Sequence, residues 1–363
     1  MLKTIIIEAT EAFNPERRGI GTQMRAWIEA APFDEFSDYT FIVAHRQLAT
    51  MDEVHVRGSN VQTRSVQAPS EESYIDQLYA YKPHVIFFPM ADSKYVRHGA
   101  TQCVGVDYGM EDFYCRDYIA SYDPMTSLLK HKTALQAFAG IVTVSRTSQR
   151  DLAWFFPEYK DKVTVVYPGV VSAKRNNEPG GLPSELKDAQ FLLIVGYEKK
   201  KNIKRITTAF DAFKAQTGSQ LKLVIVGKPG YGAHEIDEHI KTLAHQADIM
   251  RLGYVSEGQK QLLLTRCYAL VALPIYEGFG ISALEGLAAG KVVLVSNNGS
   301  LKEVAGNAGY FADPFSVESM TKQLVQMSKL KGNPKQHYIT KRLALFDQTV
   351  QSRTLLKRLT SFA

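Results

Sequence analysis

The feature that most constrains the fold of this chain is a regular alternation of short apolar runs with longer amphipathic stretches. The runs are rich in β-branched residues and apolar on both faces, which is typical of strands buried between two helix layers. We expect strands at 4–8, 39–43, 85–89, 141–144, 163–166, 191–195, 221–226, 269–273 and 292–295. We expect helices at 22–31, 73–81, 125–138, 148–155, 203–215, 258–266 and 281–288. This order predicts an α/β fold with parallel sheets.

The pattern is interrupted once, between Pro168 and Ala189. The stretch 172–181 has no hydrophobic period and is rich in turn-forming residues, which is typical of a linker. The 363 residues are enough for two domains. We therefore predict a first domain, a linker, a second domain and a last helical segment, at 1–170, 171–189, 190–345 and 346–363. By its sequence alone, the last helix could belong to either domain.

The composition excludes several classes of protein. The net charge of +6 is mild, so it is compatible with an anionic small ligand or membrane surface but does not indicate nucleic acid. The cysteines Cys103, Cys115 and Cys267 are too widely spaced for a disulfide framework or a CxxC metal site. The apolar run after Lys3 is too short for a signal-peptide core, and no stretch reaches the roughly 20 apolar residues that span a bilayer. We therefore expect a cytoplasmic protein.

Ligands of doubly wound folds bind at the carboxyl ends of strands, so the turns from strand to helix are the candidate sites. The turn at 17–22 contains Gly19 and Gly21, which let the backbone approach an anion at a helix N-terminus. A G-x-G turn is also a common plain connection, so this signal is weak by itself.

A second turn, at 196–203, carries three consecutive lysines. Lysines at a strand end can neutralise a diphosphate, and Lys201 is the best placed of the three. The alternatives are a solvated run of charges and, for Asn202, a plain helix N-cap.

The most informative turn, at 274–286, follows a buried strand. Glu277 lies in the turn, a Gly-Phe-Gly sequence supplies backbone amides at the start of a helix, and Glu285 stands four residues after Ile281 on the same helix face as the turn. Carboxylates suit the vicinal hydroxyls of sugars, and helix-start amides suit phosphates. Each glutamate alone could be a cap or a surface charge, whereas the thirteen-residue pattern is far more specific.

The segment from Glu277 to Glu285 resembles the E-x7-E signature of the retaining glycosyltransferases of family 4, which have the GT-B fold. Other parts of that family's pattern follow in the same order and cover most of the chain. They are the glycine loop at 19–21, the TVS…DL element at 141–152, PGV at 168–170, KN at 201–202, LGYV at 252–255, and the closing elements at 298–304 and 312–314.

The resemblance implies two Rossmann-like domains that face each other across a cleft, with the terminal helix crossing back to the first domain. It implies that the second domain binds a nucleotide-sugar donor and the first domain an acceptor. Lys201 would hold the diphosphate, Glu285 would bind the ribose hydroxyls, and Glu277 would contact the donor sugar near the reacting carbon. The other donor-binding residues that it implies are Gly21, Tyr197, Tyr254, Val255, Gly278, Phe279, Gly280 and Ile281.

The chain departs from the family's pattern beside Gly196. Members often have arginine or another polar residue where this chain has Tyr197. One phosphate contact would then be missing, or supplied by Lys199 or Lys200.

A second departure concerns the predicted acceptor domain. Many members carry a His-Asp pair whose histidine lies at the reacting sugar, but Val106 stands at that position here. Asp107 fits the aspartate and joins Lys201 and Glu277 as a candidate catalytic residue, although Asp107 or Glu111 could serve the acceptor instead. Other candidates for the missing histidine are His84, His131 and His234.

The resemblance implies a retaining hexosyltransferase that needs neither metal nor cofactor, and no D-x-D motif lies at a suitable turn. The expected donor is GDP-mannose or a UDP-sugar, and the expected acceptor is a hydroxyl of a glycan or lipid-linked molecule in cell-surface polysaccharide or lipopolysaccharide synthesis. The alternatives are a GT-B-like nucleotide-sugar epimerase or phosphorylase and a non-enzymatic sugar-binding protein.

An apolar cluster at 153–157 and a basic patch at 130–132 suggest peripheral contact with an anionic membrane, at the inner face of the cell membrane. Packing of the aromatic residues under the linker is the alternative.

Overall fold

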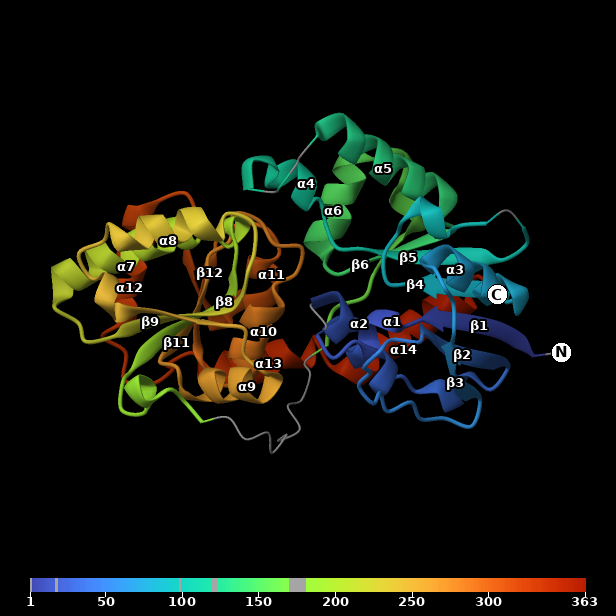
Figure 1. The fold of residues 1–363 in the computed structure, drawn as a ribbon, viewed down its shortest axis with the longest axis horizontal. Coiled ribbons are helices and arrows are strands. Elements are labelled where there is room, and N and C mark those ends of the chain that lie inside the picture. The colour runs from blue at the N-terminus through green and yellow to red at the C-terminus, as the bar shows by residue number, and fades with distance from the viewer. Residues whose placement is uncertain (1, 17–18, 98, 119, 121–122, 170–180) are drawn as a thin grey trace. The chain divides into compact units, whose positions relative to one another are not determined.

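The computed structural model describes residues 2–16, 19–97, 99–118, 120, 123–169 and 181–363. The chain divides into two compact units, each built around one parallel sheet (Figure 1). The first unit comprises Met1–Met110, Asp123–Val171 and Phe346–Ala363, and the second comprises Glu111–Tyr122 and Ser172–Leu345. The predicted α/β class with two Rossmann-like parallel-sheet domains is confirmed.

The sheet of the first unit has the strand order β3-β2-β1-β4-β5-β6-β7, so the chain reverses direction across the sheet after β3. Large apolar side chains of β1, β2 and β4 are fully buried within the unit. The strands are β1 (Lys3–Glu8), β2 (Tyr39–Arg46), β3 (Val61–Val66), β4 (Val85–Phe88), β5 (Gln102–Asp107), β6 (Gly140–Thr143) and β7 (Val163–Val165). The helices are α1 (Thr10–Phe13), α2 (Gly19–Glu29), α3 (Glu71–Ala80), α5 (Pro124–Ala137), α6 (Arg146–Phe155) and α14 (Gln348–Thr360).

The sheet of the second unit has the order β10-β9-β8-β11-β12-β13. In Figure 1, α7, α8 and α12 lie together on one side of this sheet, and α10, α11 and α13 lie on the other. The strands are β8 (Phe191–Tyr197), β9 (Lys222–Pro229), β10 (Ile249–Gly253), β11 (Ala269–Ala272), β12 (Val292–Ser296) and β13 (Gly309–Ala312). The helices are α4 (Glu111–Tyr114), α7 (Ile203–Thr217), α8 (Ala233–Lys241), α9 (Glu257–Arg266), α10 (Ile281–Ala288), α11 (Leu301–Ala305), α12 (Val317–Met327) and α13 (Gln336–Ala344).

The start of α2 differs from the prediction. The helix begins at Gly19, so Gly19 and Gly21 form its first turn instead of a loop before it. The neighbouring Arg17 and Arg18 lie outside the described residues. The first turn of a helix still presents backbone amides, so this end of α2 keeps the polarity that suits an anion.

The C-terminal segment packs on the first unit. The Phe362 ring occupies the space beside Gly140 of β6, where a Cβ would lie only 2.4 Å from the ring. The Gln351 side-chain oxygen of α14 accepts from the Tyr167 amide at 3.0 Å. The residues after Leu345 are therefore structurally part of the first unit.

The segment Glu111–Tyr122 groups with the second unit, although the expected first domain spanned residues 1–170. Within the expected linker at 171–189, the stretch 171–180 lies outside the described residues. Its described end contains a 3-10 turn, Ser184–Leu186, whose Leu186 is buried.

Candidate active site

Lys201 and Glu277 form an ion pair at the carboxyl end of the second sheet. Lys201 ends a 3-10 turn after β8, and Glu277 lies in the loop between β11 and α10. The distance from Lys201 Nζ to Glu277 Oε2 is 2.8 Å, and the two side chains are 21% and 25% exposed. Burial lowers the pKa of Lys201, but the charge and hydrogen bond of Glu277 outweigh this effect, so that pKa lies above its usual value. The pair therefore presents an ammonium and a carboxylate at one partly exposed point.

Two glycines make room for the Lys201 side chain. Gly196 has a φ of +105°, and a Cβ on it would lie 3.1 Å from the Lys201 Cε atom. Gly227, at the end of β9, has a φ of +134° and packs its backbone against Gly196. The aliphatic part of Lys201 thus lies across bare backbone, which requires glycine at these positions.

Asn202 links the lysine turn to two other loops. Its side-chain amide donates to the carbonyl oxygens of Leu273 at 3.0 Å and Pro314 at 2.7 Å. Its backbone is left-handed, with φ of +63°, and its side chain makes no cap bond to α7. Asn202 therefore stands at the N-cap position of α7, but its side chain joins the loops after β11 and β13 to the turn that carries Lys201.

The loop that carries Glu277 is held by the segment after β12. The Ser300 hydroxyl lies 2.7 Å from the carbonyl oxygens of both Glu277 and Phe279. The Asn298 side-chain amide donates to the Ile275 carbonyl oxygen at 2.7 Å. This segment corresponds to the closing elements at 298–304, and no pattern in the sequence indicates these contacts.

Gly280 connects this loop to α10 in a conformation that suits glycine. Its φ is +100°, and a Cβ would lie 2.4 Å from the Leu301 Cδ2 atom. Among the described residues, no side chain caps the start of α10. The amides at this start, where Gly280 and Ile281 stand, therefore point toward a position that suits a phosphate.

Glu285 lies one turn into α10 and pairs with Lys260 of α9. The distance from Lys260 Nζ to Glu285 Oε1 is 2.8 Å, and the side chains are 16% and 12% exposed. Burial raises the pKa of Glu285, and the Lys260 charge opposes that effect. Lys260 is not among the residues that the sequence indicates, because a contact between two helices leaves no local pattern.

The segment that begins at α4 packs beside these groups in the second unit. The Glu111 carboxylate lies 2.9 Å from Lys200 Nζ. Tyr114 stacks on Tyr276, with ring centroids 4.6 Å apart and planes inclined by 12°. Cys115 is fully buried beside Tyr276. This segment therefore covers the strand end from which the Glu277 loop starts.

The other residues of the lysine turn have carboxylate partners in the second unit. Lys199 pairs with Glu235 of α8 at 3.3 Å, and Lys200 pairs with Glu111. Tyr197 is buried, and its hydroxyl donates to Asp237. Of the three lysines, Lys201 is therefore the one that contacts Glu277.

Tyr254 and Val255 lie just beyond β10, which ends at Gly253. The Tyr254 ring is 57% exposed, and Lys228 Nζ lies 5.1 Å from its centroid. An exposed ring beside the α9 start is compatible with stacking on a base.

The first unit contains Asp107 at the carboxyl end of β5. Its Oδ1 atom accepts from the Gly109 amide at 2.8 Å, and its Oδ2 atom lies 3.8 Å from His131 Nε2. Val106 is buried in the sheet. Of the histidine candidates, His131 lies beside Asp107, while His84 accepts from the Thr4 amide at the opposite end of its strand and His234 is exposed on α8.

The described residues contain neither a metal-binding cluster nor a membrane-spanning helix. No group of three or more His, Cys, Asp or Glu side chains there is arranged to hold a metal ion. None of the described helices is long and apolar enough to cross a membrane.

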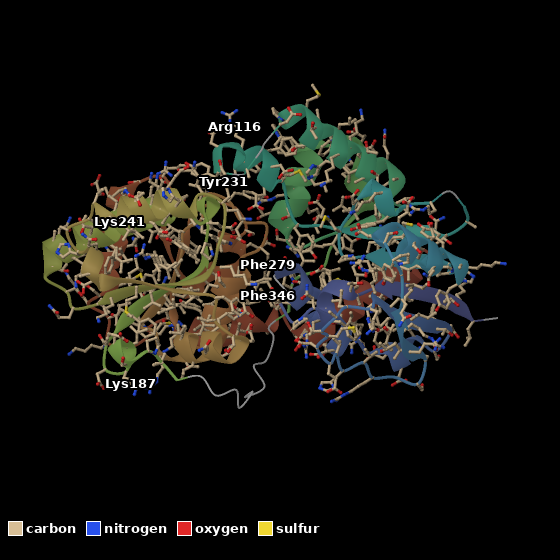
Figure 2. All side chains as sticks on the ribbon, in the orientation of Figure 1. Arg116, Lys187, Tyr231, Lys241, Phe279 and Phe346 are labelled. Atoms are coloured by element: carbon tan, nitrogen blue, oxygen red, sulfur yellow. The ribbon has the colours of Figure 1, made fainter. Side chains whose placement is uncertain are left out.

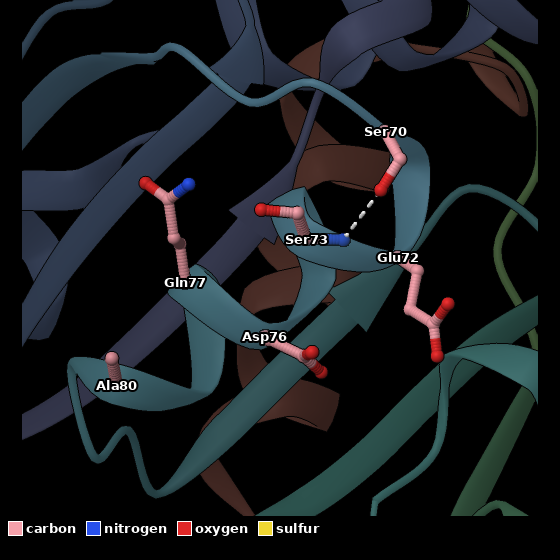
Figure 3. A pocket seen from close by; sticks show the side chains of 6 residues that line it. All are labelled: Ser70, Glu72, Ser73, Asp76, Gln77 and Ala80. Atoms are coloured by element: carbon pink, nitrogen blue, oxygen red, sulfur yellow. Dashed lines mark hydrogen bonds between the residues drawn. The ribbon is translucent and has the colours of Figure 1, made fainter.

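A surface hollow of about 440 Å³ lies along α3 (Figure 3). Its lining comes from this single helix and its N-cap, and Ser70 Oγ is already used to accept from the Ser73 amide. Among the described residues, no second element contributes a polar group to the lining, so we assign no chemistry to this hollow.

Comparisons with known proteins concern the fold and the family likeness of the chain. Residues 174–343 match the model of the family Glycosyl transferases group 1. The structure superposes on a sucrose-phosphate synthase from Thermosynechococcus elongatus with a TM-score of 0.72 and 15% identity, covering 99% of this chain and 100% of that one. Anabaena Alr3699/HepE in complex with UDP and glucose gives a TM-score of 0.67 at 15% identity, covering 99% and 100%. The chain has the GT-B fold.

Curated relatives of this GT-B chain include mannosyltransferases. It is 35% identical over 150 residues to the alpha-1,3/1,6-mannosyltransferase ALG2 of Dictyostelium discoideum, covering 36% of each chain. It is 25% identical over 253 residues to O-antigen chain mannosyltransferase B of Escherichia coli, covering 68% of this chain and 65% of the relative. The matches thus span about a third of the first relative and just under two thirds of the second. Together with the family match, they support a glycosyltransferase.

Proposed function

We propose that this chain is a retaining, metal-independent glycosyltransferase that moves a hexose from a nucleoside-diphosphate sugar to a hydroxyl of a glycan or lipid-linked acceptor. The observation that carries the proposal is the Lys201–Glu277 ion pair beside the start of α10. A cation and helix-start amides suit the diphosphate, while a carboxylate suits sugar hydroxyls. This combination is what a nucleotide sugar requires.

The proposed chemistry breaks the bond between the anomeric carbon and the diphosphate. Negative charge grows on the leaving diphosphate, and Lys201 with the amides at Gly280 and Ile281 would stabilise it. Glu277 would bind sugar hydroxyls and face the positive charge that develops on the ring. The acceptor hydroxyl would lose its proton to the leaving phosphate on the same face, which yields retention.

Asp107 in the first unit is proposed to act on the acceptor. It lies at a strand's carboxyl end, where ligands of parallel α/β sheets bind, and His131 is close to its Oδ2 atom. We assign it no step in the departure of the diphosphate.

The names of the curated relatives make mannose the first sugar to test. Both relatives described above are named mannosyltransferases, and one is named for the O-antigen chain. We propose GDP-mannose as the donor, with UDP-sugars as alternatives, and a role in polysaccharide or lipopolysaccharide synthesis. A panel of GDP- and UDP-sugars with and without polyprenyl-linked acceptors, read by product mass and anomeric NMR, tests this.

The panel also separates the alternative functions. An α-linked product from an α-linked donor, formed in EDTA, supports the proposal. Sugar isomerisation without an acceptor would indicate an epimerase. Binding of free sugars without stabilisation by GDP or UDP would indicate a sugar-binding protein.

Peripheral contact with an anionic membrane is a further part of the proposal. On α5, Met125 and Leu129 are 69% and 64% exposed beside the exposed Lys130, and Trp154 of α6 is 82% exposed. Phe156 is buried, so the predicted cluster at 153–157 is only partly a surface feature. Flotation with vesicles of anionic or zwitterionic lipid tests the contact, and equal recovery with both lipids would contradict it.

A further inference from the structure

The Lys260–Glu285 ion pair joins two neighbouring helices of the second unit, α9 and α10. Lys260 Nζ lies 2.8 Å from Glu285 Oε1 and 3.0 Å from Glu257 Oε2. Glu285 is only 12% exposed, and Glu257 is 45% exposed. Lys260 therefore bridges the nearly buried carboxylate of Glu285 on α10 and the solvent-facing carboxylate of Glu257 on α9, its own helix.

The direction of Lys260 is set by the start of α9. The Ser256 hydroxyl accepts from the Gln259 amide at 3.3 Å, and the Gln259 side-chain oxygen accepts from the Ser256 amide at 3.0 Å. This capping box defines the first turn of α9. Lys260 follows directly, and its own amide donates to the Ser256 carbonyl oxygen at 2.8 Å. The backbone that carries Lys260 is therefore fixed by these bonds, and the ion pairs with Glu257 and Glu285 place its ammonium.

The ion pair with Lys260 engages only one of the two carboxylate oxygens of Glu285. Lys260 binds Oε1, and within the described residues Oε2 makes no hydrogen bond. A carboxylate has enough lone pairs to accept from two vicinal hydroxyls while one oxygen is held by an ammonium. A nearly buried carboxylate without a cation beside it favours its protonated form, which accepts hydrogen bonds poorly.

We propose that Lys260 is a positioning residue, which holds Glu285 through Oε1 and thereby directs Oε2 to the ribose hydroxyls of the nucleotide. The inference rests on the proposed function, because it takes Glu285 as the ribose ligand. Lys260 does not itself contact the reacting atoms. Its contribution is to keep a buried carboxylate charged and in one orientation before the nucleotide arrives, which lowers the cost of binding.

An opposite role for the same contact is that Lys260 competes with the ribose for Glu285. The two roles predict opposite signs. If Lys260 positions Glu285, its removal weakens nucleotide binding. If Lys260 competes with the ribose, its removal strengthens binding.

The test measures binding of GDP, UDP and their 2′,3′-dideoxy forms by calorimetry to the wild-type protein and to Lys260→Met. Methionine is unbranched and only one atom shorter than lysine, and it removes the charge. We expect the ribonucleotide to bind about 10-fold more weakly to this variant. We expect the dideoxy forms to bind both proteins equally, because they lack the hydroxyls that Glu285 would contact.

The matched control is Lys241→Met on α8. Lys241 forms an exposed ion pair with Glu238 at 2.7 Å and projects from the surface of the second unit (Figure 2). Its replacement should leave every affinity within twofold. Lys260→Arg, which keeps a cation near Glu285, should recover part of the preference for ribose. A variant that only disturbed packing would lose ribonucleotide and dideoxynucleotide binding alike, and that result would overturn the inference.

Glu285→Gln separates this inference from the proposed function. If it loses the preference for ribose while Lys260→Met retains it, the positioning role fails and the nucleotide site stands. Unchanged or tighter ribonucleotide binding by Lys260→Met also overturns the inference. If neither GDP nor UDP binds the wild-type protein, the proposed function and this inference both fail.

Discussion

Lys201 and Glu277 are 76 residues apart in the chain, yet their side chains meet at 2.8 Å. They meet because β8 and β11 are neighbours in one parallel sheet, so that the turns after them lie side by side. No local pattern in the sequence indicates that these two residues are partners. The pair is therefore the first place to test the proposed site.

Lys201→Met and Glu277→Gln should each reduce sugar transfer by about 100-fold or more, because each removes a charge that stabilises the transition state. Initial rates with the active donor measure this. Lys199→Met is the matched control, since Lys199 belongs to the same turn but pairs with Glu235. An equal loss in the control would show that the turn's overall charge matters and not the Lys201–Glu277 pair.

Gly280→Ala should destabilise the protein by about 2–4 kcal/mol, because it adds a clash with Leu301 to a strained φ of +100°. Gly218→Ala isolates the backbone strain: Gly218 has a φ of +62° and open space around its Cβ direction. We expect it to cost about 1 kcal/mol. Urea unfolding measures both free energies, and similar costs for the two variants would contradict the clash.

Tyr114 and Tyr276 should be energetically coupled by about 0.5–1.5 kcal/mol, because their rings stack within the second unit. A double-mutant cycle with alanine at each position, read by unfolding, gives this value. Tyr81, which is as exposed as Tyr114 at 46%, belongs to the first unit and supplies the control cycle with Tyr276. Zero coupling for Tyr114 would mean that the α4 segment does not pack there in solution.

Glu8→Gln should stabilise the protein more at pH 8 than at pH 4. Burial raises the pKa of Glu8, and the hydrogen bonds from Thr10 and Tyr74 only partly oppose it. Below the unfolded pKa the carboxyl is protonated in both states, and wild-type stability is lost as pH rises through the folded pKa. Glutamine keeps the acceptor oxygen without the charge, so the difference should grow with pH.

Glu35→Gln should show the opposite dependence of stability on pH. The hydrogen bond from Arg353 lowers the pKa of Glu35, so the wild type should lose its advantage over this variant as pH falls through the folded pKa. Chemical unfolding at several pH values measures both slopes. If the stability difference from wild type changed with pH in the same direction for both variants, the opposite pKa shifts of Glu8 and Glu35 would be contradicted.

The α/β class, the strands that are buried on both faces and the candidate turns could all be predicted from the residues. These features are local, since burial on both faces makes a strand apolar throughout and a strand end places the next residues at the sheet edge. The helix at Ile281–Ala288 has the predicted limits, and Lys201 and Glu277 were both chosen from such turns.

Features that depend on partners far along the chain could not be predicted and are set by how the elements pack. The edge strand β3 was not predicted, because the residues in its middle are polar and exposed. It forms because β2 pairs with it. The Glu111–Tyr122 segment lies in the unit opposite to the one its sequence neighbours suggest. Lys199, Lys200 and Lys201 are chemically identical, and packing alone gives them different carboxylates. The role of Lys260 could not be predicted for the same reason. An ion pair between two helices depends on how those helices pack, and it produces no periodic pattern in the sequence.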